Sequence, residues 1–347
     1  MWATLYNCVM AVALATALWS AGRSGRPGTF LLAALAVGGL GTLMAITLSE
    51  DLFGAMRLLT YGLFGFVALL CLVAAFVLRC SHRRWAAVFL ASFVAIESVA
   101  ADAFLVEPHW LEISRVRVTT NKLNGPLKIA LLADLQTDEI GDYERVVIEA
   151  IVAEKPDLIL LAGDYIQEHD DHRYVQLQDE LQMLLAGSDF RAPLGCYAVR
   201  GNVDRSDWAD AFLGTGVTAV SKTGSFDLEN LTITCLSLHD SFSTNLEVPG
   251  TDRFHVVVGH CPNFSLGDVQ ADLLLAGHCH GGQVRLPILG PLITHALVPR
   301  SWAAGVTHLP GDKTLIVSRG VGMERANAPR MRFRCRPELV FIDIVPR

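Results

Sequence analysis

Two histidines, His278 and His280, stand two residues apart in a glycine-rich turn that follows the apolar run Leu-Leu-Leu-Ala. Alternate residues of an extended backbone point to the same side, so both imidazole rings can face one point. The flanking glycines let other backbone or a bulky ligand approach closely. Because imidazole is the commonest neutral metal ligand in proteins, this motif predicts a metal site at the end of a strand.

Four further apolar runs also end in side chains that can bind metal. Their terminal residues are, in chain order, Asp134 with Gln136, then Asp164, Asn202 and His260. Carboxylate, amide and imidazole donors at successive strand ends form the ligand set of a two-metal hydrolytic centre. The alternative is that each Asp or Asn caps a following helix, which explains one position well and the whole set poorly.

The strand-end motifs resemble those of the calcineurin-like metallophosphoesterases, whose pattern is Asp-x-His, Gly-Asp, Gly-Asn-His-(Asp/Glu), His and Gly-His-x-His. The segments 281–287, 317–322 and 332–338 are similar to the membrane-anchored bacterial branch of that superfamily. The resemblance covers roughly residues 115–347. It implies an α/β fold, a four-layer αββα sandwich, with the ligands gathered at one edge.

The resemblance also implies roles for individual residues. One metal would be held by Asp134, Gln136, Asp164 and His280, and the other by Asp164, Asn202, His260 and His278. Asp164 would bridge two divalent ions, either Mn, Fe or Zn with Mn favoured, so that a shared hydroxide attacks the phosphorus. Asp164, Asn202 and Asp204 are the expected catalytic residues.

Two positions depart from the family pattern. Gln136 replaces a histidine ligand, and a glutamine carbonyl oxygen can still coordinate a cation. Val203 replaces the histidine thought to protonate the leaving group, and coordination cannot replace that proton donor. His169 and His172, shortly after Asp164, could supply the proton, although a solvated polar loop is the simpler interpretation.

Arginine recurs at every second position from residue 330 to residue 336. A strand there would present one arginine face, which suits phosphate, so Arg332 and Arg336 are candidate substrate-binding residues. An exposed charged strand is the alternative interpretation.

The N-terminal third of the chain predicts a membrane domain. Residues 2–22, 29–48, 58–78 and 85–106 are apolar stretches, each long enough to cross a bilayer. We therefore expect a membrane domain at 1–106 and a metallophosphoesterase domain at 107–347. Arginines in the first and third connections place those connections in the cytoplasm, so the protein is expected in the inner (cytoplasmic) membrane as a multi-pass protein with an extracytoplasmic catalytic domain.

Charge and cysteine content exclude some classes of function. Residues 103–347 carry 22 basic and 31 acidic side chains, a net charge of −9, which argues against nucleic-acid binding. The eight cysteines show no C-x-x-C spacing and indicate no disulfide framework. Cys279, between the two histidines of the glycine-rich turn, is expected to point away from the metals.

Strand patterns are predicted at 127–134, 158–163, 196–201, 231–238, 254–260, 271–277 and 338–345, and helices at 143–154 and 173–186. The expected function is a membrane-anchored, metal-dependent hydrolase of phosphodiester or pyrophosphate bonds, with a phosphorylated small molecule or lipid as substrate and the bilayer as partner. One alternative is a pyrophosphatase of a lipid-linked nucleotide sugar, although such nucleotides are normally cytoplasmic. Another is a catalytically silent protein that binds metal and phosphate.

Overall fold

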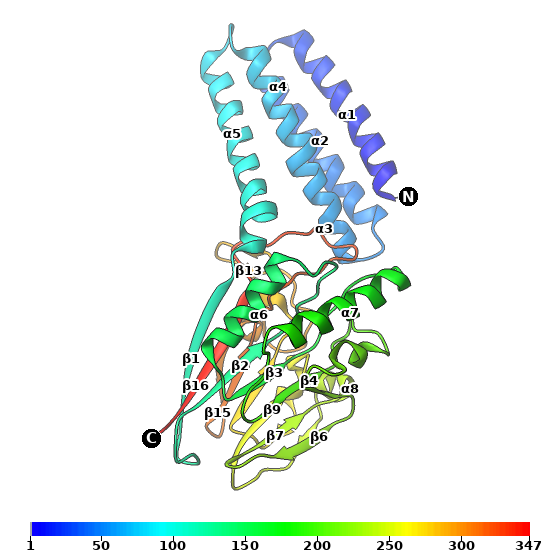
Figure 1. Ribbon diagram of the computed structural model, residues 1–347. Helices are drawn as coiled ribbons and strands as arrows, with labels where there is room; N and C mark the ends of the chain where they lie inside the picture. Colours follow the sequence, from blue (N-terminus) through cyan, green and yellow to red (C-terminus); the bar gives the residue numbers. More distant parts are fainter. Residues whose placement is uncertain (1) are drawn as a thin grey trace. The chain divides into compact units, whose positions relative to one another are not determined.

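The computed structural model describes residues 2–347, which form two compact units. The first unit extends to Val106 and includes Glu324–Arg330, and the second comprises Glu107–Met323 and Met331–Arg347. The chain therefore passes between the units at three points. Figure 1 labels many of the elements of both units.

The first unit is entirely helical in its N-terminal part. Its elements are α1 (Trp2–Ser24), α2 (Pro27–Leu48), α3 (Leu52–Thr60), the π-helical η1 (Tyr61–Val67), α4 (Ala68–Leu78), α5 (Arg83–Ala101) and η2 (Asp102–Val106). In the returning segment, Asn327 donates to the Asp51 carboxylate at 2.9 Å and accepts from Arg57 at 3.4 Å. These two bonds tie Glu324–Arg330 to the helical unit.

Within residues 2–347, four segments are long and apolar enough to cross a membrane. They are Trp2–Ser24, Pro27–Leu48, Leu52–Leu78 and Arg83–His109, with mean hydropathies of 1.4, 2.1, 2.5 and 1.9. The helices pack through buried side chains such as Tyr6 and Phe30, while Leu32, Leu43 and Phe76 are exposed. Exposed apolar side chains of this kind suit helices solvated by lipid, and the four segments overlap the four predicted spans.

The second unit contains two six-stranded sheets. The first has the strand order β1 (Glu112–Thr120), β16 (Glu338–Pro346), β2 (Leu127–Leu132), β3 (Leu158–Leu161), β4 (Cys196–Val199) and β5 (Val217–Val220). The second has the order β14 (Gly305–Leu309), β15 (Lys313–Val317), β11 (Leu273–Ala276), β9 (Phe254–Val258), β7 (Leu231–Cys235) and β6 (Gly224–Asp227). Two small strand pairs are β8 (Glu247–Val248) with β10 (Asp268–Val269) and β12 (Arg285–Leu286) with β13 (Gly290–Pro291).

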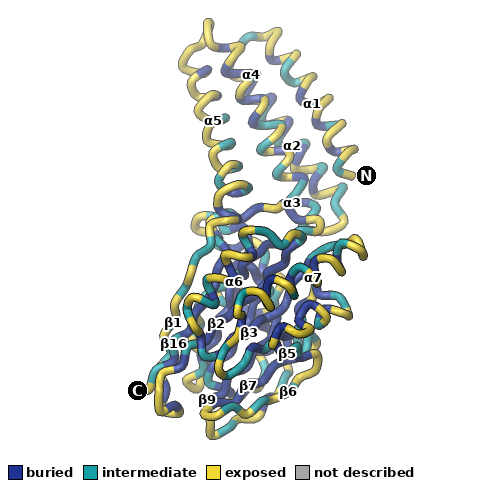
Figure 2. The backbone as a smooth tube through the Cα atoms, in the orientation of Figure 1, coloured by how far each residue is buried: buried dark blue, intermediate teal, exposed yellow. Residues whose placement is uncertain are grey.

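Alternating side chains define the layers of this unit. Ile129 and Leu131 of β2 face the second sheet and pack with Val256 and Leu275. Ala130 and Leu132 face the other way, toward α6 (Asp142–Glu154) and α7 (Asp171–Gly187). Figure 2 shows the central strands, such as β2 and β3, buried and the outer faces of these two helices exposed.

Short helices cover the outer face of the second sheet. These are α8 (Leu238–Phe242) and the 3-10 turns η5 (Pro262–Leu266) and η7 (Arg300–Trp302), which contribute Phe264 and Trp302 to the cluster around Val257 and Leu274. The remaining 3-10 turns are η3 (Glu107–His109), η4 (Trp208–Phe212) and η6 (His280–Gly282). The expected layered α/β sandwich is confirmed, with a thin fourth layer.

Strands β2, β3 and β4 run parallel to one another, as do β9 and β11. The carboxyl ends of parallel strands lie at the same edge of a sheet, so the loops that follow them are neighbours. This arrangement positions every candidate metal ligand that the sequence identified.

Candidate metal centre

Five of the seven candidate ligands lie two or three residues beyond the strands that position them. Asp134 follows β2, Asp164 follows β3, and Asn202 follows β4, whereas His260 and His278 follow β9 and β11 of the other sheet. Backbone hydrogen bonds hold neighbouring loops together beyond the strands. Asp134 N donates to Gly163 O at 3.0 Å, and Gly277 N donates to His260 O at 2.9 Å.

Left-handed backbone is concentrated among the candidate ligands. Of the seven, five have a positive φ: Asp134 (50°), Gln136 (38°), Asp164 (58°), His278 (68°) and His280 (46°). Residues other than glycine rarely adopt this conformation, and such strain clusters at functional sites. Neighbouring glycines make room for it, since a Cβ atom on Gly201 would lie 2.1 Å from Asp164 Oδ1.

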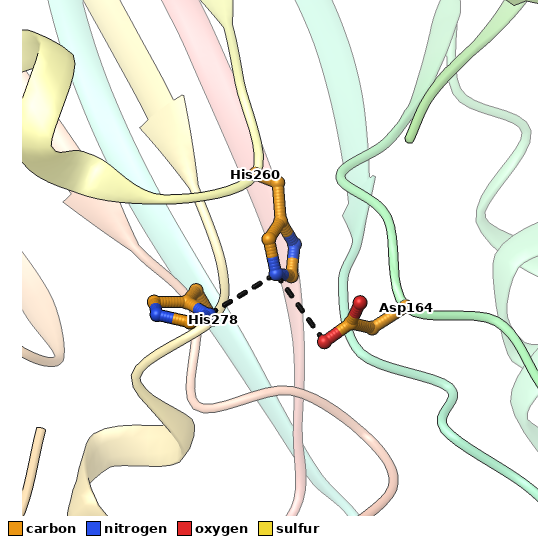
Figure 3. A group of neighbouring side chains, drawn as sticks. All are labelled: Asp164, His260 and His278. Carbon is orange, nitrogen blue, oxygen red and sulfur yellow. Dashed lines mark hydrogen bonds and ion pairs between the residues drawn. The ribbon is translucent and has the colours of Figure 1, made fainter. Parts of the chain in front are cut away.

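Three side chains from the two sheets converge most closely. The potential ligand atoms of Asp164, His260 and His278 all lie within 4.8 Å of one another. Figure 3 shows these three side chains pointing toward one another. His260 Nε2 is 3.2 Å from Asp164 Oδ2 and 3.1 Å from His278 Nδ1. Asn202 Oδ1 lies 2.8 Å from the same His260 nitrogen. Two imidazoles, a carboxylate and an amide oxygen thus surround one position.

Backbone carbonyls orient the two imidazoles. His260 Nδ1 lies 2.8 Å from Ala162 O, and His278 Nε2 lies 3.1 Å from His295 O. Because a carbonyl can only accept, each of these ring nitrogens carries the proton. The other ring nitrogen, Nε2 of His260 and Nδ1 of His278, faces the shared position and would bind a cation there in its deprotonated form.

Asp134, Gln136 and His280 lie around the same loops. The Asp134 carboxylate accepts from His278 N at 3.0 Å, and Gln136 N donates to Asp164 O at 2.8 Å. The Gln136 side-chain nitrogen donates to Gln167 at 3.0 Å. His280 Nδ1 lies 3.5 Å from the Arg332 guanidinium, so this part of the site includes a fixed positive charge.

The protonation behaviour of the histidines fits metal binding. Burial, followed by the charge of His260, lowers the pKa of His278 to about 4. Burial and then Arg332 lower the pKa of His280 well below its usual value. For His260, burial opposes protonation, but the charge and hydrogen bond of Asp164 outweigh it and raise the pKa to about 9. Two of the three imidazoles are therefore neutral at pH 7, the form that binds metal.

Three carboxylates are buried together beside these histidines. Burial raises the pKa of Asp134 to about 7, and burial followed by the charge of Asp164 raises that of Asp204 to about 6. For Asp164 burial acts in the same direction, but His260 outweighs it and the net pKa is lowered. Buried carboxylates are stabilised by a cation, so the donor set fits divalent metal.

Asp204 positions the loops. Its carboxylate accepts from the backbone N–H groups of Asp164 at 2.9 Å, Tyr165 at 2.7 Å and Gly201 at 2.7 Å. Val203 N in turn donates to Asp164 Oδ1 at 2.9 Å. The carboxylate expected to be catalytic thus binds the backbone that carries Asp164.

The arginine segment differs from the predicted strand. Arg332 is fully buried, and its guanidinium donates to the carbonyls of Arg319, Gly320, Gly322 and Cys335. Arg336 lies over the Trp110 ring at 4.1 Å and donates to Trp110 O. Arg334 has a φ of 53°, which interrupts any extended run. The structure thus uses Arg332 to hold the loop behind His280 and places Arg336 against the start of the domain.

The polar segment after Asp164 is a helix cap. Asp170 accepts from Arg173 N at 2.9 Å at the start of α7, and Arg205 pairs with Asp171 at 2.7 Å. His169 and His172 are exposed. Cys279 is buried in an apolar cluster with Leu274 and Ala276 of β11, and all eight cysteines are free.

Several contributors to the site were not identified from the sequence. The Ala162 and His295 carbonyls belong to the backbone, so their residue types do not reveal them. Phe242, whose ring is 5.0 Å from that of His278, lies in α8, a helix that was not predicted. Gly320 does belong to a motif noted in the sequence. A Cβ atom there would lie 2.6 Å from the Asp134 Cβ, so only glycine fits beside this ligand.

Comparison with known proteins agrees with this geometry. The model of the calcineurin-like phosphoesterase family matches residues 127–282. An uncharacterized metallophosphoesterase, YkuE of Bacillus subtilis, is 30% identical over 259 residues, 69% of this chain and 87% of the relative. The phosphodiesterase YaeI of Escherichia coli is 28% identical over 285 residues, 76% of this chain and 99% of the relative. The UDP-2,3-diacylglucosamine pyrophosphatase LpxG of Chlamydia muridarum is 22% identical over 331 residues, 73% of this chain and 97% of the relative.

The fold, the convergent donors and these relatives define a phosphoesterase that uses divalent metal. The chain belongs to the calcineurin-like metallophosphoesterases and is a phosphoric ester hydrolase. Its four apolar segments mark it as a membrane protein.

Proposed function

We propose that this chain hydrolyses a phosphodiester or pyrophosphate bond in a lipid or cell-envelope substrate while anchored in the inner membrane. The observation that carries the proposal is the convergence of Asp164, His260 and His278, whose ligand atoms lie within 4.8 Å of one another. Ligands that come from both sheets and converge on one point suit a metal-assisted displacement at phosphorus.

The proposed ligands divide into two groups that share Asp164. Asp164, Asn202, His260 and His278 would hold one divalent cation, and Asp134, Gln136, Asp164 and His280 the other. The mixture of oxygen and imidazole donors favours Mn, Fe or Zn, with Mn preferred for its affinity for carboxylates. When bound, the two cations would supply an activated water and offset charge on the phosphoryl oxygens.

The leaving group is constrained by Val203. Its backbone N–H donates to Asp164 Oδ1, and its aliphatic side chain stands in the sequence where the family carries a proton donor. An aliphatic side chain cannot protonate a departing oxygen. The proposed substrates are therefore pyrophosphates or phosphodiesters whose leaving group departs as a stable anion.

A second candidate is a pyrophosphatase of a lipid-linked nucleotide sugar. It is favoured by the relative named UDP-2,3-diacylglucosamine pyrophosphatase, which this chain covers over 97% of its length. Release of a nucleoside monophosphate from such a substrate would support it. Turnover of simple phosphodiesters without nucleotide release would favour the first candidate.

The deciding experiment uses the full chain purified in detergent. Metal content is measured by inductively coupled plasma mass spectrometry, and turnover is measured with bis-p-nitrophenyl phosphate before and after EDTA treatment and Mn²⁺ restoration. Two metal equivalents with restorable turnover would support the proposal. Metal binding without turnover of any phosphoester would instead indicate a silent phosphate-binding protein.

A further inference from the structure

Residues 287–297, which we term the apolar loop, expose an unusual number of apolar side chains. Ile288, Leu289, Leu292 and Leu297 are all exposed, and Ile288 is fully so. The loop spans the turn between β12 and β13 and the segment that follows, and it lies near the β13 label in Figure 1. Clustered exposed apolar side chains mark an interaction surface.

The backbone at the tip of the apolar loop is strained. Ile288 has a φ of 72°, a conformation that β-branched residues rarely adopt. Glycine or asparagine is the usual residue for such a turn in water. A fully exposed isoleucine in this conformation is suited to a loop tip whose side chain is buried in an apolar environment on binding.

The apolar loop is fastened to the metal site. His278 Nε2 lies 3.1 Å from His295 O, which belongs to the loop. Gly282, two residues after His280, packs so closely on the loop that a Cβ atom there would lie 2.3 Å from Pro291 Cβ. Whatever the loop binds is therefore brought next to the candidate ligands.

A groove continues the apolar surface toward the site. Leu297 lines a groove of about 560 Å³ together with Leu238 and Phe242 of α8. The Phe242 ring lies 5.0 Å from the His278 ring in an edge-on arrangement. Apolar surface thus runs from the loop to the edge of the metal ligands.

The base of the apolar loop is bonded to the segment where the chain enters the domain. Arg285 N donates to Phe333 O at 2.9 Å, and Arg334 N donates to the Glu107 carboxylate at 2.7 Å. Glu107 directly follows the last residue of the membrane unit. Glu107, at the start of the domain, and the base of the apolar loop are therefore both bonded to the same segment, residues 333 and 334.

The charges around the apolar loop favour a lipid surface. Arg285, Arg300 and Arg334 flank it, and the last two are exposed. Basic side chains beside an apolar tip suit anionic lipid headgroups above an acyl layer. The described residues also include four segments long and apolar enough to cross a bilayer.

We propose that the apolar loop inserts into the acyl layer of the membrane and delivers a lipid phosphate headgroup to the metal centre. Insertion follows from the loop alone, whereas the identity of that lipid as substrate rests on the proposed hydrolase function. The substrate class is thereby a phosphoester whose apolar part remains in the bilayer.

Insertion is tested in proteoliposomes with the full chain. Ile288→Cys is labelled with bimane in a background carrying Cys8→Ser and Cys80→Ser, which removes the exposed native thiols. Doxyl-labelled lipids are expected to quench this label at least about twofold, and to leave a label at Leu213→Cys, an exposed apolar position elsewhere, unchanged. Equal quenching at the two positions, or none at residue 288, would overturn insertion.

Delivery is tested with two substrates that share a leaving group. The Ile288→Ser/Leu289→Ser variant is assayed with phosphatidyl-p-nitrophenol in vesicles and with soluble bis-p-nitrophenyl phosphate, and Met183→Ser/Leu213→Ser is the control. We expect kcat/KM to fall about tenfold on the lipid and to stay constant on the soluble substrate. Equal losses on both substrates, or no loss on the lipid, would overturn delivery. Wild type inactive on both substrates would instead overturn the proposed function.

Discussion

His260 Nε2 lies 3.2 Å from Asp164 Oδ2 although the two residues follow strands of different sheets, β9 and β3. The candidate centre therefore exists only where the two sheets meet. A cation held by both residues would crosslink the sheets, so metal binding and domain stability should be coupled.

Asp164→Ala is expected to reduce turnover to background and to lower metal content. The substitution removes a carboxylate that the proposal places on both cations. Mn²⁺ should raise the melting temperature of wild type in scanning fluorimetry but not that of the variant. Asp252→Ala, which changes an exposed carboxylate, serves as the control. Full metal content and turnover in Asp164→Ala would refute the shared-ligand assignment.

Gly320→Ala should weaken metal binding about 10- to 100-fold without altering any ligand. Its Cβ atom would lie 2.6 Å from Asp134 Cβ, so the ligand must move. Gly311→Ala is the matched control because Gly311 has a similar φ of 79° and open space around the Cβ position. In the control, the free energy of unfolding should fall only by the cost of the backbone strain, about 1–2 kcal/mol. Equal metal affinities in the two variants, measured by titration calorimetry, would contradict this packing argument.

Metal binding is expected to release protons below pH 9. His260, with a pKa of about 9 without metal, is protonated at pH 7 and must lose that proton to bind a cation. His278, with a pKa of about 4, is already neutral. Affinity should therefore rise up to about tenfold per pH unit from pH 7 to 9 and then level off. Calorimetry in buffers of different ionisation enthalpy measures the released protons, and a pH-independent affinity would argue against this pairing.

Val203→His is expected to accelerate hydrolysis of esters with poor leaving groups. A general acid contributes about 10²- to 10⁴-fold only where the departing oxygen needs a proton. Alkyl phosphodiesters should therefore gain, while release of p-nitrophenolate changes little. Asp204 is already bonded to three backbone N–H groups, so the new imidazole is oriented without it and the gain should lie at the lower end. Equal gains on both substrate types would contradict protonation of the leaving group by the new histidine.

The arginines of the third connection predict the orientation in the membrane. Arg79, Arg83 and Arg84 predict a cytoplasmic connection and an extracytoplasmic catalytic domain. Alkaline phosphatase fused after Arg347 should be active, and a cytoplasmic reporter such as green fluorescent protein should not fluoresce there. The opposite pattern would reverse the orientation and favour a cytoplasmic nucleotide-sugar substrate.

The sequence predicted best those features that depend on strand ends. Asp134, Asp164 and His260 were located because each follows a buried apolar run, and parallel strands must bring such ends together. The helix predicted at 143–154 is observed as α6, and the one predicted at 173–186 lies within α7. Strands β1, β5, β6, β14 and β15 were missed. β1 alternates exposed and partly buried residues, and the other four are short and partly exposed or lie after irregular loops.

Arg332 shows where sequence reasoning could not succeed. Alternating arginines predict a strand with one charged face. The carbonyls that accept from the buried Arg332 guanidinium are brought to it only by the tertiary structure, so the sequence cannot reveal them. Arg332 donates to the carbonyls of Gly320 and Gly322, which lie in a loop without the regular alternation of a strand. The role of Asp204 was hidden for the same reason, since backbone N–H groups leave no trace in residue type.

Glu107 determines where a fragment that contains only the catalytic domain can begin. Its buried carboxylate accepts the backbone N–H groups of Arg334 and Cys335, and the Cys335 thiol in turn bonds to His280 O at 3.1 Å. A fragment that begins at β1 would look complete by its strands yet leave both N–H groups without their acceptor. A fragment that begins at Glu107 keeps them paired. The turn Glu107–His109, which precedes β1, is thus part of the folded catalytic domain and not only a linker.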